Sequence, residues 1–384
     1  MKKLISLLIV TIMFSGCFCF GTSAVNESEI EVRAKAAVLM DASTGQVLYS
    51  FNENERLYPA SVTKIMPLLL FMEALDGGKI ALTDTVTASV TAAGKGGSQI
   101  WLKEGETMTV DELLRATAIA SANDACTALG EHIAGSETGF VKMMNDRARE
   151  LGMVNTNFVN CSGLDDDTTE HLTTAYDIAL MSKELLSHER IKTYTTVWMD
   201  SLRGGETQLV NTNKLVRFYS GTTGLKTGTT TKAGHCLSAS AERDGLHLIA
   251  VVMGAENSND RFEGAKAMLN WGFANYETVT PQIDSSLFGE VKIIKGVEES
   301  VKPKLVGVKS LTLKSGEKNN VQPYVELCEN AEAPIEKNQI LGNVILRIGD
   351  REIARYNLVS ENYVEKTNIG HIVVRFLSSL AKSA

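Results

Sequence analysis

The sequence predicts an α+β protein in which an antiparallel sheet with an inserted helical region is followed by a small β-rich domain. Strand-like runs lie near both ends of residues 33–277, and helical patterns lie between them. After residue 280 the composition changes to short alternating runs separated by Lys, Glu, Gly and Pro. A chain of 384 residues, of which 44% are hydrophobic, is long enough for two such domains.

The N-terminal segment predicts export from the cytoplasm. Residues 1–24 combine a basic start, an apolar run and a small-x-Ala exit, which is the pattern of a signal peptide cleaved after Ala24. The apolar run is short for an uncleaved membrane anchor. Gly16-Cys17 resembles a lipoprotein cleavage site, and the sequence leaves that alternative open. We expect an extracytoplasmic protein.

Two strand pairs bound the first domain. Residues 36–40 and 46–51 are predicted as a β-hairpin. Residues 236–242 and 246–253 are predicted as another hairpin, joined at Asp244-Gly245. Because helical patterns separate the two pairs, we expect one sheet that is built from both ends of the domain.

Four periodic patterns predict helices in this domain. They cover residues 110–120, 140–151, 174–186 and 261–273. At the start of the third, Thr174 and Asp177 are spaced as in a capping box. A further apolar run follows Ser61, and Pro67 is expected to kink or delay that helix because proline has no N–H to donate.

The C-terminal part divides into residues 280–364, predicted as a small all-β domain, and residues 365–384, predicted as an amphipathic tail. In the tail the apolar residues share one helical face, the polar residues share the other, and no acidic residue follows Glu365. This pattern favours a helix that lies on a membrane surface over one docked on its own domain. It is too short and too polar to span a bilayer.

Composition excludes several classes of function. The net charge of −8, without a basic cluster that contains aromatic residues, argues against nucleic-acid binding. The mature chain would keep four widely spaced cysteines and no C-x-x-C pair, so we expect no metal site. These are Cys126, Cys161, Cys236 and Cys328. Isolated cysteines are more often small buried hydrophobes than disulfides, but the sequence leaves their state open.

Three short motifs occur in order within the first domain. They are Ser61-Val62-Thr63-Lys64, Ser121-Ala122-Asn123 and Lys226-Thr227-Gly228. Imitations of single motifs occur at Ser315–Lys318, Ser379–Lys382, Ser360–Asn362 and Lys314–Gly316. Those copies lie in the β domain or the tail and do not follow the required order. The ordered series is the signature of serine enzymes that transfer acyl groups.

The chemistry of these residue types supports the same activity. A serine hydroxyl needs an adjacent base to become a good nucleophile. On a helix, Lys64 can reach Ser61 because residues three apart are neighbours. Burial and the nearby cation of Lys226 would lower the Lys64 pKa and let it accept a proton. Ser121 can relay a proton to the leaving amine, and Asn123 can hold the lysine and the substrate.

An acyl-transfer site also needs N–H donors for the negative oxygen of its intermediate. The backbone N–H of Ser61, at a helix N-terminus, is one candidate. The third motif is expected to precede a strand, and the N–H of Thr229 in that strand is the second candidate.

These motifs and their flanking residues resemble the D-alanyl-D-alanine carboxypeptidases, which are the low-molecular-mass penicillin-binding proteins of bacterial cell walls. The resemblance covers about residues 33–365 and includes further blocks at Lys35–Asp41, Gly163-Leu164, His171–Asp177, Ile249–Gly254 and Arg261–Phe273. It implies a β-lactamase/transpeptidase-like catalytic domain, a peripheral place on the outer face of the cytoplasmic membrane, and no cofactor.

The resemblance also implies roles for individual residues. Ser61 would attack the penultimate D-alanine of a peptidoglycan stem pentapeptide, and β-lactams would acylate the same hydroxyl. The implied catalytic residues are Ser61, Lys64, Ser121 and Asn123. The implied substrate-binding residues are Lys226, Thr227, Gly228, Thr229 and Arg261. Among these, Lys226, Thr227 and Arg261 would bind the terminal carboxylate, for which a cationic pocket suits.

Two positions depart from the family's usual pattern. Ala122 replaces a more common glycine, and Thr229 stands where some relatives carry histidine. A serine β-lactamase is disfavoured because no Glu-x-x-Leu-Asn lies between the second and third motifs. A receptor that is acylated but does not turn over stays an alternative. The sequence also leaves open the biological timing, the cross-bridge preference and the oligomeric state.

Overall fold

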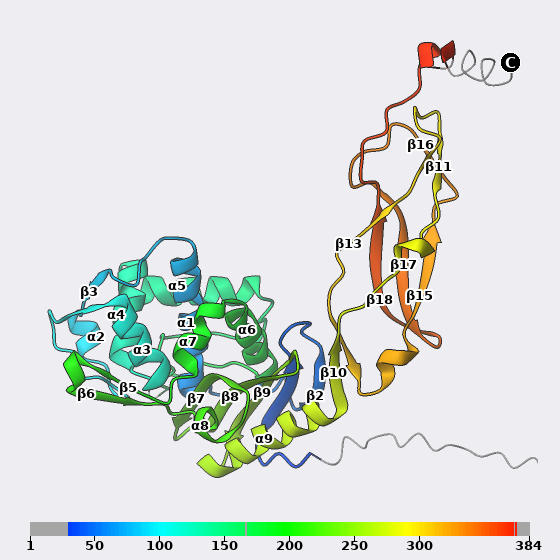
Figure 1. The fold of residues 1–384 in the computed structure, drawn as a ribbon. Helices are drawn as coiled ribbons and strands as arrows, with labels where there is room; N and C mark the ends of the chain where they lie inside the picture. Colours follow the sequence, from blue (N-terminus) through cyan, green and yellow to red (C-terminus); the bar gives the residue numbers. More distant parts are fainter. Residues whose placement is uncertain (1–29, 166, 372, 375–384) are drawn as a thin grey trace, which may run out of the picture.

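The computed structural model describes residues 30–165, 167–371 and 373–374. The predicted signal peptide, residues 1–24, lies outside the described residues. Figure 1 shows a rounded α/β part joined to an elongated β part. The rounded part holds every residue of the three ordered motifs.

A five-stranded antiparallel sheet forms the centre of the first part, in the order β2-β1-β9-β8-β7. Its strands are β1 (Ala36–Asp41), β2 (Val47–Phe51), β7 (Thr222–Thr230), β8 (Gly234–Arg243) and β9 (Leu246–Ala255). The N-terminal strand β1 pairs directly with β9, with Ala36 opposite Met253. The prediction of one sheet built from both ends of the domain is therefore confirmed.

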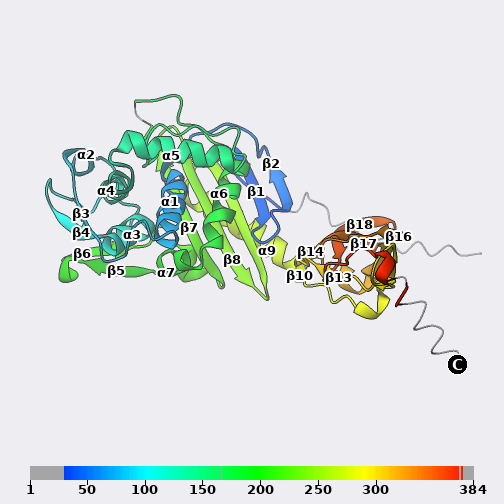
Figure 2. The ribbon, with the colours of Figure 1, turned by 90° about the horizontal axis from the view of Figure 1, so that it is seen from above.

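Helices cover both faces of this sheet, as Figures 1 and 2 show. The described helices are α1 (Ile65–Asp76), α2 (Val90–Ala93), α3 (Val110–Ile119), α4 (Asn123–Ala134), α5 (Glu137–Glu150), α6 (Ala175–Ser187), α7 (Lys192–Thr195), α8 (Leu215–Phe218) and α9 (Ser258–Asn275). On one face α1 and α5 meet through stacked rings of Phe71 and Phe140, whose centroids are 5.4 Å apart. On the other face α9 packs on β8 and β9 and closes a second apolar core.

Short strand pairs complete this part of the chain. They are β3 (Thr85–Thr87) with β4 (Thr107–Thr109), and β5 (Met199–Leu202) with β6 (Thr207–Val210). The first pair leads into α3, and the second lies between α7 and α8. Both pairs belong to the region inserted between β2 and β7.

Two local predictions need correction. The third motif does not precede a strand, because Lys226 lies in the middle of β7. Thr174 does cap α6 by accepting the Asp177 N–H, but the Asp177 carboxylate accepts from the Thr156 hydroxyl instead of completing a capping box. The complete capping box lies at the start of α3, between Thr109 and Glu112.

Pro67 delays its helix, as predicted. Residues Ala60–Lys64 form a 3₁₀ helix, η2, and α1 begins only at Ile65. Pro67 is then the third residue of α1, where a missing N–H costs nothing because the first-turn N–H groups have no partner within the helix. The delay leaves the first motif on the tighter 3₁₀ turn, in which residues three apart are eclipsed.

The C-terminal part consists of β strands, as predicted. Its strands are β10 (Tyr276–Val279), β11 (Val291–Ile294), β12 (Ser300–Val301), β13 (Lys304–Val306), β14 (Leu311–Lys314), β15 (Gln322–Leu327), β16 (Asn330–Glu332), β17 (Ile340–Ile348) and β18 (Arg351–Val359). Four of them form a sheet in the order β13-β18-β17-β15. Three more, β12-β11-β16, form a second sheet.

The two parts meet next to the end of α9. Strand β10 follows α9 directly and pairs with β14, and the Ser315 N–H donates to the Asn275 carbonyl at 2.8 Å. The Thr312 hydroxyl donates to the buried Asp41 carboxylate at the end of β1. None of the helices in the described ranges is long and apolar enough to cross a membrane. Most of the predicted amphipathic tail, at 372 and 375–384, lies outside those ranges.

Candidate active site

Ser61 and Lys64 meet on η2. The Lys64 ammonium donates to the Ser61 hydroxyl at 3.0 Å, to the Asn123 side-chain oxygen at 2.5 Å and to the Ser162 carbonyl at 2.8 Å. The Lys64 side chain is fully buried. The lysine is therefore held by three separate segments of chain with its nitrogen against the serine oxygen.

Burial also changes the acidity of the two lysines of the site. Removal from water lowers the Lys64 pKa to about 8. The pKa of Lys226 is lowered as well, by burial first and then by the charges of Lys64 and Arg261. Of the two predicted causes, only burial lowers the pKa of Lys64, and the predicted effect of the Lys226 charge on Lys64 is not found. The repulsion acts in the other direction, because the Lys64 charge adds to burial in lowering the pKa of Lys226.

The second motif lies at the start of α4. Ser121 has a left-handed backbone with φ of +64°, and its hydroxyl is buried without a hydrogen-bond partner among the described residues. Asn123 uses both ends of its amide, because its oxygen accepts from Lys64 and its nitrogen donates to the Gly96 carbonyl at 2.7 Å. Asn123 is thus fixed, whereas the Ser121 hydroxyl has a bond left to make.

The third motif places β7 against η2. A Cβ at Gly228 would lie 2.8 Å from the Ser61 nitrogen, so only glycine lets the strand approach this closely. Lys226 is fully buried and donates to the Thr227 carbonyl at 3.1 Å. The Thr227 hydroxyl donates to the Thr212 hydroxyl at 2.7 Å.

Arg261 reaches the edge of β7 from the first turn of α9. Its guanidinium donates to the Gly228 carbonyl and to the Thr229 hydroxyl, each at 3.0 Å. Its Nε is buried and has no partner among the described residues. The structure therefore brings all nine predicted site residues together, from η2, α4, β7 and α9.

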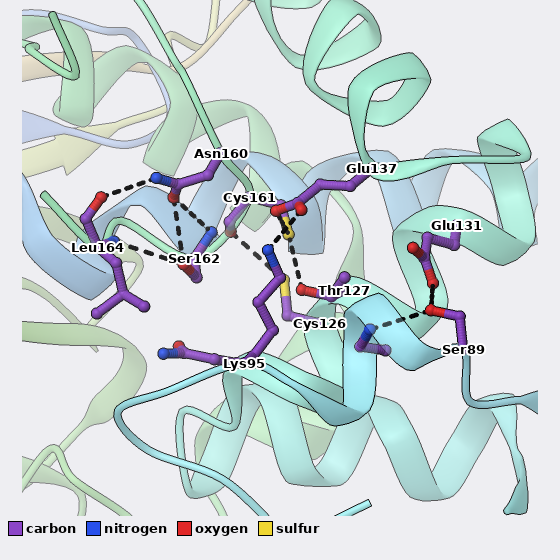
Figure 3. A network of polar contacts seen from close by, with 12 residues as sticks. Ser89, Lys95, Cys126, Thr127, Glu131, Glu137, Asn160, Cys161, Ser162 and Leu164 are labelled. Carbon is purple, nitrogen blue, oxygen red and sulfur yellow. Dashed lines mark hydrogen bonds and ion pairs between the residues drawn. The ribbon is translucent and has the colours of Figure 1, made fainter. Parts of the chain in front are cut away.

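Sequence reasoning missed the wall formed by residues 160–164. The Asn160 side-chain oxygen accepts the N–H groups of Ser162 and Gly163 at 3.1 and 2.7 Å, which turns the Ser162 carbonyl toward Lys64. Figure 3 shows this turn beside Cys161 and Leu164. A backbone carbonyl leaves no mark in the sequence, and the available signals were the Asn-x-x-Gly spacing typical of a turn and the Gly163-Leu164 block of the family resemblance.

His171 is a second contributor that sequence reasoning did not assign to the site. The Val159 N–H donates to its Nδ1 at 3.0 Å, so Nε2 carries the proton and donates to the Thr63 hydroxyl at 2.9 Å. Burial, and then the charge of Lys64, lower the His171 pKa to about 4. A neutral histidine therefore holds the middle of the first motif.

The described part of the chain contains four free cysteines. Cys126, Cys161 and Cys236 are buried and Cys328 is exposed. Cys126 donates to the Cys161 carbonyl, and the Cys161 thiol contacts the Thr127 hydroxyl and the Glu137 carboxylate (Figure 3). The described residues contain no group of three or more His, Cys, Asp or Glu side chains arranged to hold a metal ion.

Comparison with known proteins identifies relatives along the whole chain. A family model described as D-alanyl-D-alanine carboxypeptidase, Peptidase S11, matches residues 22–257. A second, described as penicillin-binding protein 5, C-terminal domain, matches residues 276–366. The chain is 41% identical to D-alanyl-D-alanine carboxypeptidase DacF of Bacillus subtilis over 100% of both chains. It is 35% identical to DacC of Escherichia coli over 87% of this chain and 85% of the relative.

Solved structures give the same assignment. Penicillin-binding protein 5 of Haemophilus influenzae superimposes with a TM-score of 0.79 at 32% identity, over 88% of this chain and 98% of that one. Penicillin-binding protein D2 of Listeria monocytogenes, in its cefotaxime-bound form, has a TM-score of 0.59 at 32% identity and covers 64% of this chain and 98% of its own. The ordered motifs, the sheet and these matches agree, and the chain belongs to the Peptidase S11 family of serine-type D-alanyl-D-alanine carboxypeptidases.

Proposed function

We propose that this protein is a serine-type carboxypeptidase that removes the terminal D-alanine from peptidoglycan stem pentapeptides through an acyl-enzyme on Ser61. Cross-linking requires a stem peptide that still ends in D-Ala-D-Ala as its acyl donor. Removal of the terminal D-alanine takes away this donor, so the enzyme limits cross-linking. The observation that carries the proposal is the Lys64 nitrogen, 3.0 Å from the Ser61 oxygen, in a buried site that lowers its pKa to about 8. A lysine that is partly neutral near neutral pH can act as the base.

Acylation begins when Lys64 takes the Ser61 proton and the serine oxygen attacks the carbonyl carbon of the penultimate D-alanine. The negative oxygen that forms lies between the backbone N–H groups of Ser61 and Thr229. Collapse of the intermediate breaks the peptide bond. The Ser121 hydroxyl, which is buried and has no hydrogen-bond partner among the described residues, relays the proton that Lys64 took from Ser61 to the leaving D-alanine nitrogen.

The free carboxylate of the substrate gives specificity for a C-terminal residue. The side chains of Lys226, Thr227 and Arg261, from β7 and α9, bind this carboxylate. Gly228 and Thr229 offer backbone groups along the same strand. Water then attacks the acyl-enzyme carbonyl while Lys64 accepts a proton from that water. The bond between the carbonyl carbon and the Ser61 oxygen breaks, Lys64 returns the proton to that oxygen, and the shortened stem peptide leaves.

A β-lactam presents a strained amide and a carboxylate in place of the D-Ala-D-Ala end, so it acylates Ser61 by the same first step. Relatives that share this catalytic part include the Listeria protein in its cefotaxime-bound and ampicillin-bound forms. The enzyme therefore acts as a penicillin target.

The decisive experiment measures D-alanine release from diacetyl-L-Lys-D-Ala-D-Ala by the purified protein. We expect turnover by the wild type, and neither turnover nor penicillin labelling by Ser61→Ala. Stoichiometric penicillin labelling of the wild type without D-alanine release would show a receptor instead of an enzyme. Residual turnover in Ser61→Ala would mean that another residue is the nucleophile.

We also propose how the chain is divided and placed. Residues 1–24 direct export, residues 33–277 form the catalytic domain, residues 280–364 form the β domain, and residues 365–384 hold the enzyme on the outer face of the cytoplasmic membrane. The apolar stripe of the tail supports the membrane role. Deleting the residues after Lys366 should leave activity intact and release the protein from vesicles. Continued sedimentation with vesicles would show that the tail does not anchor it.

A further inference from the structure

A pocket of about 280 Å³ adjoins the active site on the side of residues 160–168. We call it the stem-peptide pocket. Its lining residues are Lys95, Val159, Asn160, Ser162, Leu164, Asp167 and Thr168. None of them belongs to the three motifs, and the reaction described above gives this pocket no role.

The catalytic residues themselves hold the walls of the stem-peptide pocket. The Ser162 carbonyl accepts from Lys64 at 2.8 Å, and Lys64 lies 3.0 Å from the Ser61 oxygen. Lys95 also lines the pocket, and the carbonyl of its neighbour Gly96 accepts from Asn123 at 2.7 Å. The pocket therefore begins within about two residues' length of the nucleophile, since one extended residue spans about 3.3–3.6 Å.

The course of β7 indicates which end of the substrate faces the pocket. Thr227, a carboxylate-binding residue, bonds to Thr212 on one side of the strand. Thr230, three residues farther along, bonds through its hydroxyl to Asp165, in the loop that carries the pocket, at 2.6 Å. A substrate whose carboxylate is held at Thr227 thus extends toward the pocket with its N-terminal part. The residue next to D-Ala-D-Ala is the diamino acid of the stem peptide.

The lining of the pocket offers both signs of charge. Lys95 forms an ion pair of 2.5 Å with Glu137, and both side chains are less than one-fifth exposed. Figure 3 shows Lys95 extending toward Glu137, close to Cys161 and the Asn160 turn. An ammonium has three donors, so Lys95 can bind Glu137 and a substrate carboxylate together. The exposed carboxylate of Asp167 can accept from a substrate ammonium.

We propose that the stem-peptide pocket binds the side chain of the diamino acid that precedes D-Ala-D-Ala, and that it selects a side chain ending in both an ammonium and a carboxylate. Lys95 binds the carboxylate and Asp167 binds the ammonium. The selection rests on the proposed carboxypeptidase activity and names its substrate class. A site built to bond a polar group discriminates against substrates that lack it, because its own polar groups are then left unpaired.

The test compares three soluble substrates. These are Nα-acetyl-meso-diaminopimelyl-D-Ala-D-Ala, Nα-acetyl-L-Lys-D-Ala-D-Ala and diacetyl-L-Lys-D-Ala-D-Ala, which end in a zwitterion, an ammonium and a neutral amide. We expect the wild-type kcat/KM to be highest for the first, by about tenfold over the third, a factor that one charged hydrogen bond can supply. Equal values for all three would overturn the selection while leaving the carboxypeptidase proposal intact. If the enzyme releases D-alanine from none of the three substrates, the proposed carboxypeptidase activity itself would be overturned.

Substitutions then test which pocket residues are responsible for the preference among the three substrates. Lys95→Gln should bring the zwitterion-to-ammonium ratio of kcat/KM close to one, and Lys95→Arg should keep most of the preference. Asp167→Asn should lower the ammonium-to-amide ratio. The matched control is Lys103→Gln, an exposed lysine of the same loop that does not line the pocket, and it should behave as wild type.

A structural effect of Lys95 gives a different result. Loss of its ion pair with Glu137 would lower kcat/KM for all three substrates by the same factor and lower the melting temperature. Unchanged ratios in Lys95→Gln, with or without that general loss, would contradict the proposal. Penicillin acylation of Ser61, measured in each variant, reports whether the catalytic residues remain in place.

Discussion

At the scale of single residues, the proposed activity depends on a lysine whose pKa is lowered by burial. Lys64 makes three hydrogen bonds and has no exposed surface, and its pKa falls to about 8. Its neutral fraction is the form that can accept the Ser61 proton. Because this fraction grows as the pH rises toward and past the pKa, we expect the rate of acylation to depend on pH.

The second-order rate of acylation by penicillin should therefore rise about tenfold per pH unit below 8 and level off above it. His171 adds no change in this range, since its pKa of about 4 keeps it neutral. Stopped-flow acylation from pH 6 to 9.5 measures the profile. A rate that falls above pH 8 would mean that protonated Lys64 is the active form, and a rate that is flat across this range would mean that acylation does not depend on the titration of Lys64.

Ser121 should separate activity from stability. Its hydroxyl is buried without a partner, so Ser121→Ala loses no hydrogen bond of the folded protein. We expect the free energy of unfolding to change by less than about 1 kcal/mol. The kcat/KM for D-alanine release should fall by about 10²–10⁴, as when a proton-transfer group is removed. Urea unfolding and steady-state kinetics test the two parts, and a large loss of stability would show that the hydroxyl has a structural role.

The sequence was most informative about the identity of single residues of the site. Ser61, Lys64, Ser121, Asn123 and the third motif were predicted from their order and spacing, and the structure brings them together. Ser162 was not found, because its contribution is a carbonyl that any residue possesses. The partner of Thr63 could not be predicted either, since His171 is 108 residues away in the chain.

At the scale of elements, the active site requires close contact between η2 and the turn at residues 160–164. A Cβ at Gly163 would lie 1.8 Å from the Ala60 carbonyl oxygen and 2.7 Å from the Thr63 hydroxyl. The same glycine has φ of +88°, which other residues adopt only with strain. No other residue fits at this contact.

Gly163→Ala should consequently destabilise the protein by about 3 kcal/mol or more, because two backbone segments would have to move apart. It should also slow acylation, since the turn carries the Ser162 carbonyl. Gly96→Ala is the matched control for stability, as its Cβ would meet no atom within 4 Å. Urea unfolding of both variants makes the comparison. Equal stabilities would show that the turn can shift freely.

The sequence predicted which elements exist better than where they begin. Helix α9 begins at Ser258 and not at Arg261, because Asn257 caps it. Helix α4 was not predicted, although it begins at Asn123 of the second motif. Strand β7 was expected only after the motif, since its Lys, Thr and Gly residues lack the apolar alternation of a strand. Its pairing with β8 and its contact with η2 override that weak local signal.

At the scale of the whole molecule, the catalytic part and the β part share a narrow junction. The described contacts there include the β10–β14 pair, the Ser315 bond to Asn275 and the bond between Thr312 and Asp41. Every motif residue belongs to the catalytic part. The solved chain of the Listeria relative matches 64% of this chain over 98% of its own length.

A chain that ends at Asn275 should therefore fold and release D-alanine from a soluble peptide at a rate within about twofold of the full chain. Its melting temperature should be lower, because Asp41 loses its Thr312 partner and the end of β1 is uncovered. Circular dichroism and the D-alanine assay on both chains provide the measurement. An insoluble or inactive truncated chain would show that the catalytic part needs the β part to fold.

The sequence by itself determined the chemistry and the order of the parts: an ordered set of three motifs, a sheet built from both ends of its domain, and a β domain behind it. These features depend on residue type and periodicity, which are local properties of the chain. Only the tertiary structure decided the depth at which Lys64 is buried, the carbonyl that holds it, and the stem-peptide pocket beside it. Those features arise where segments distant in sequence pack together, and burial and contact between such segments have no local pattern in the sequence.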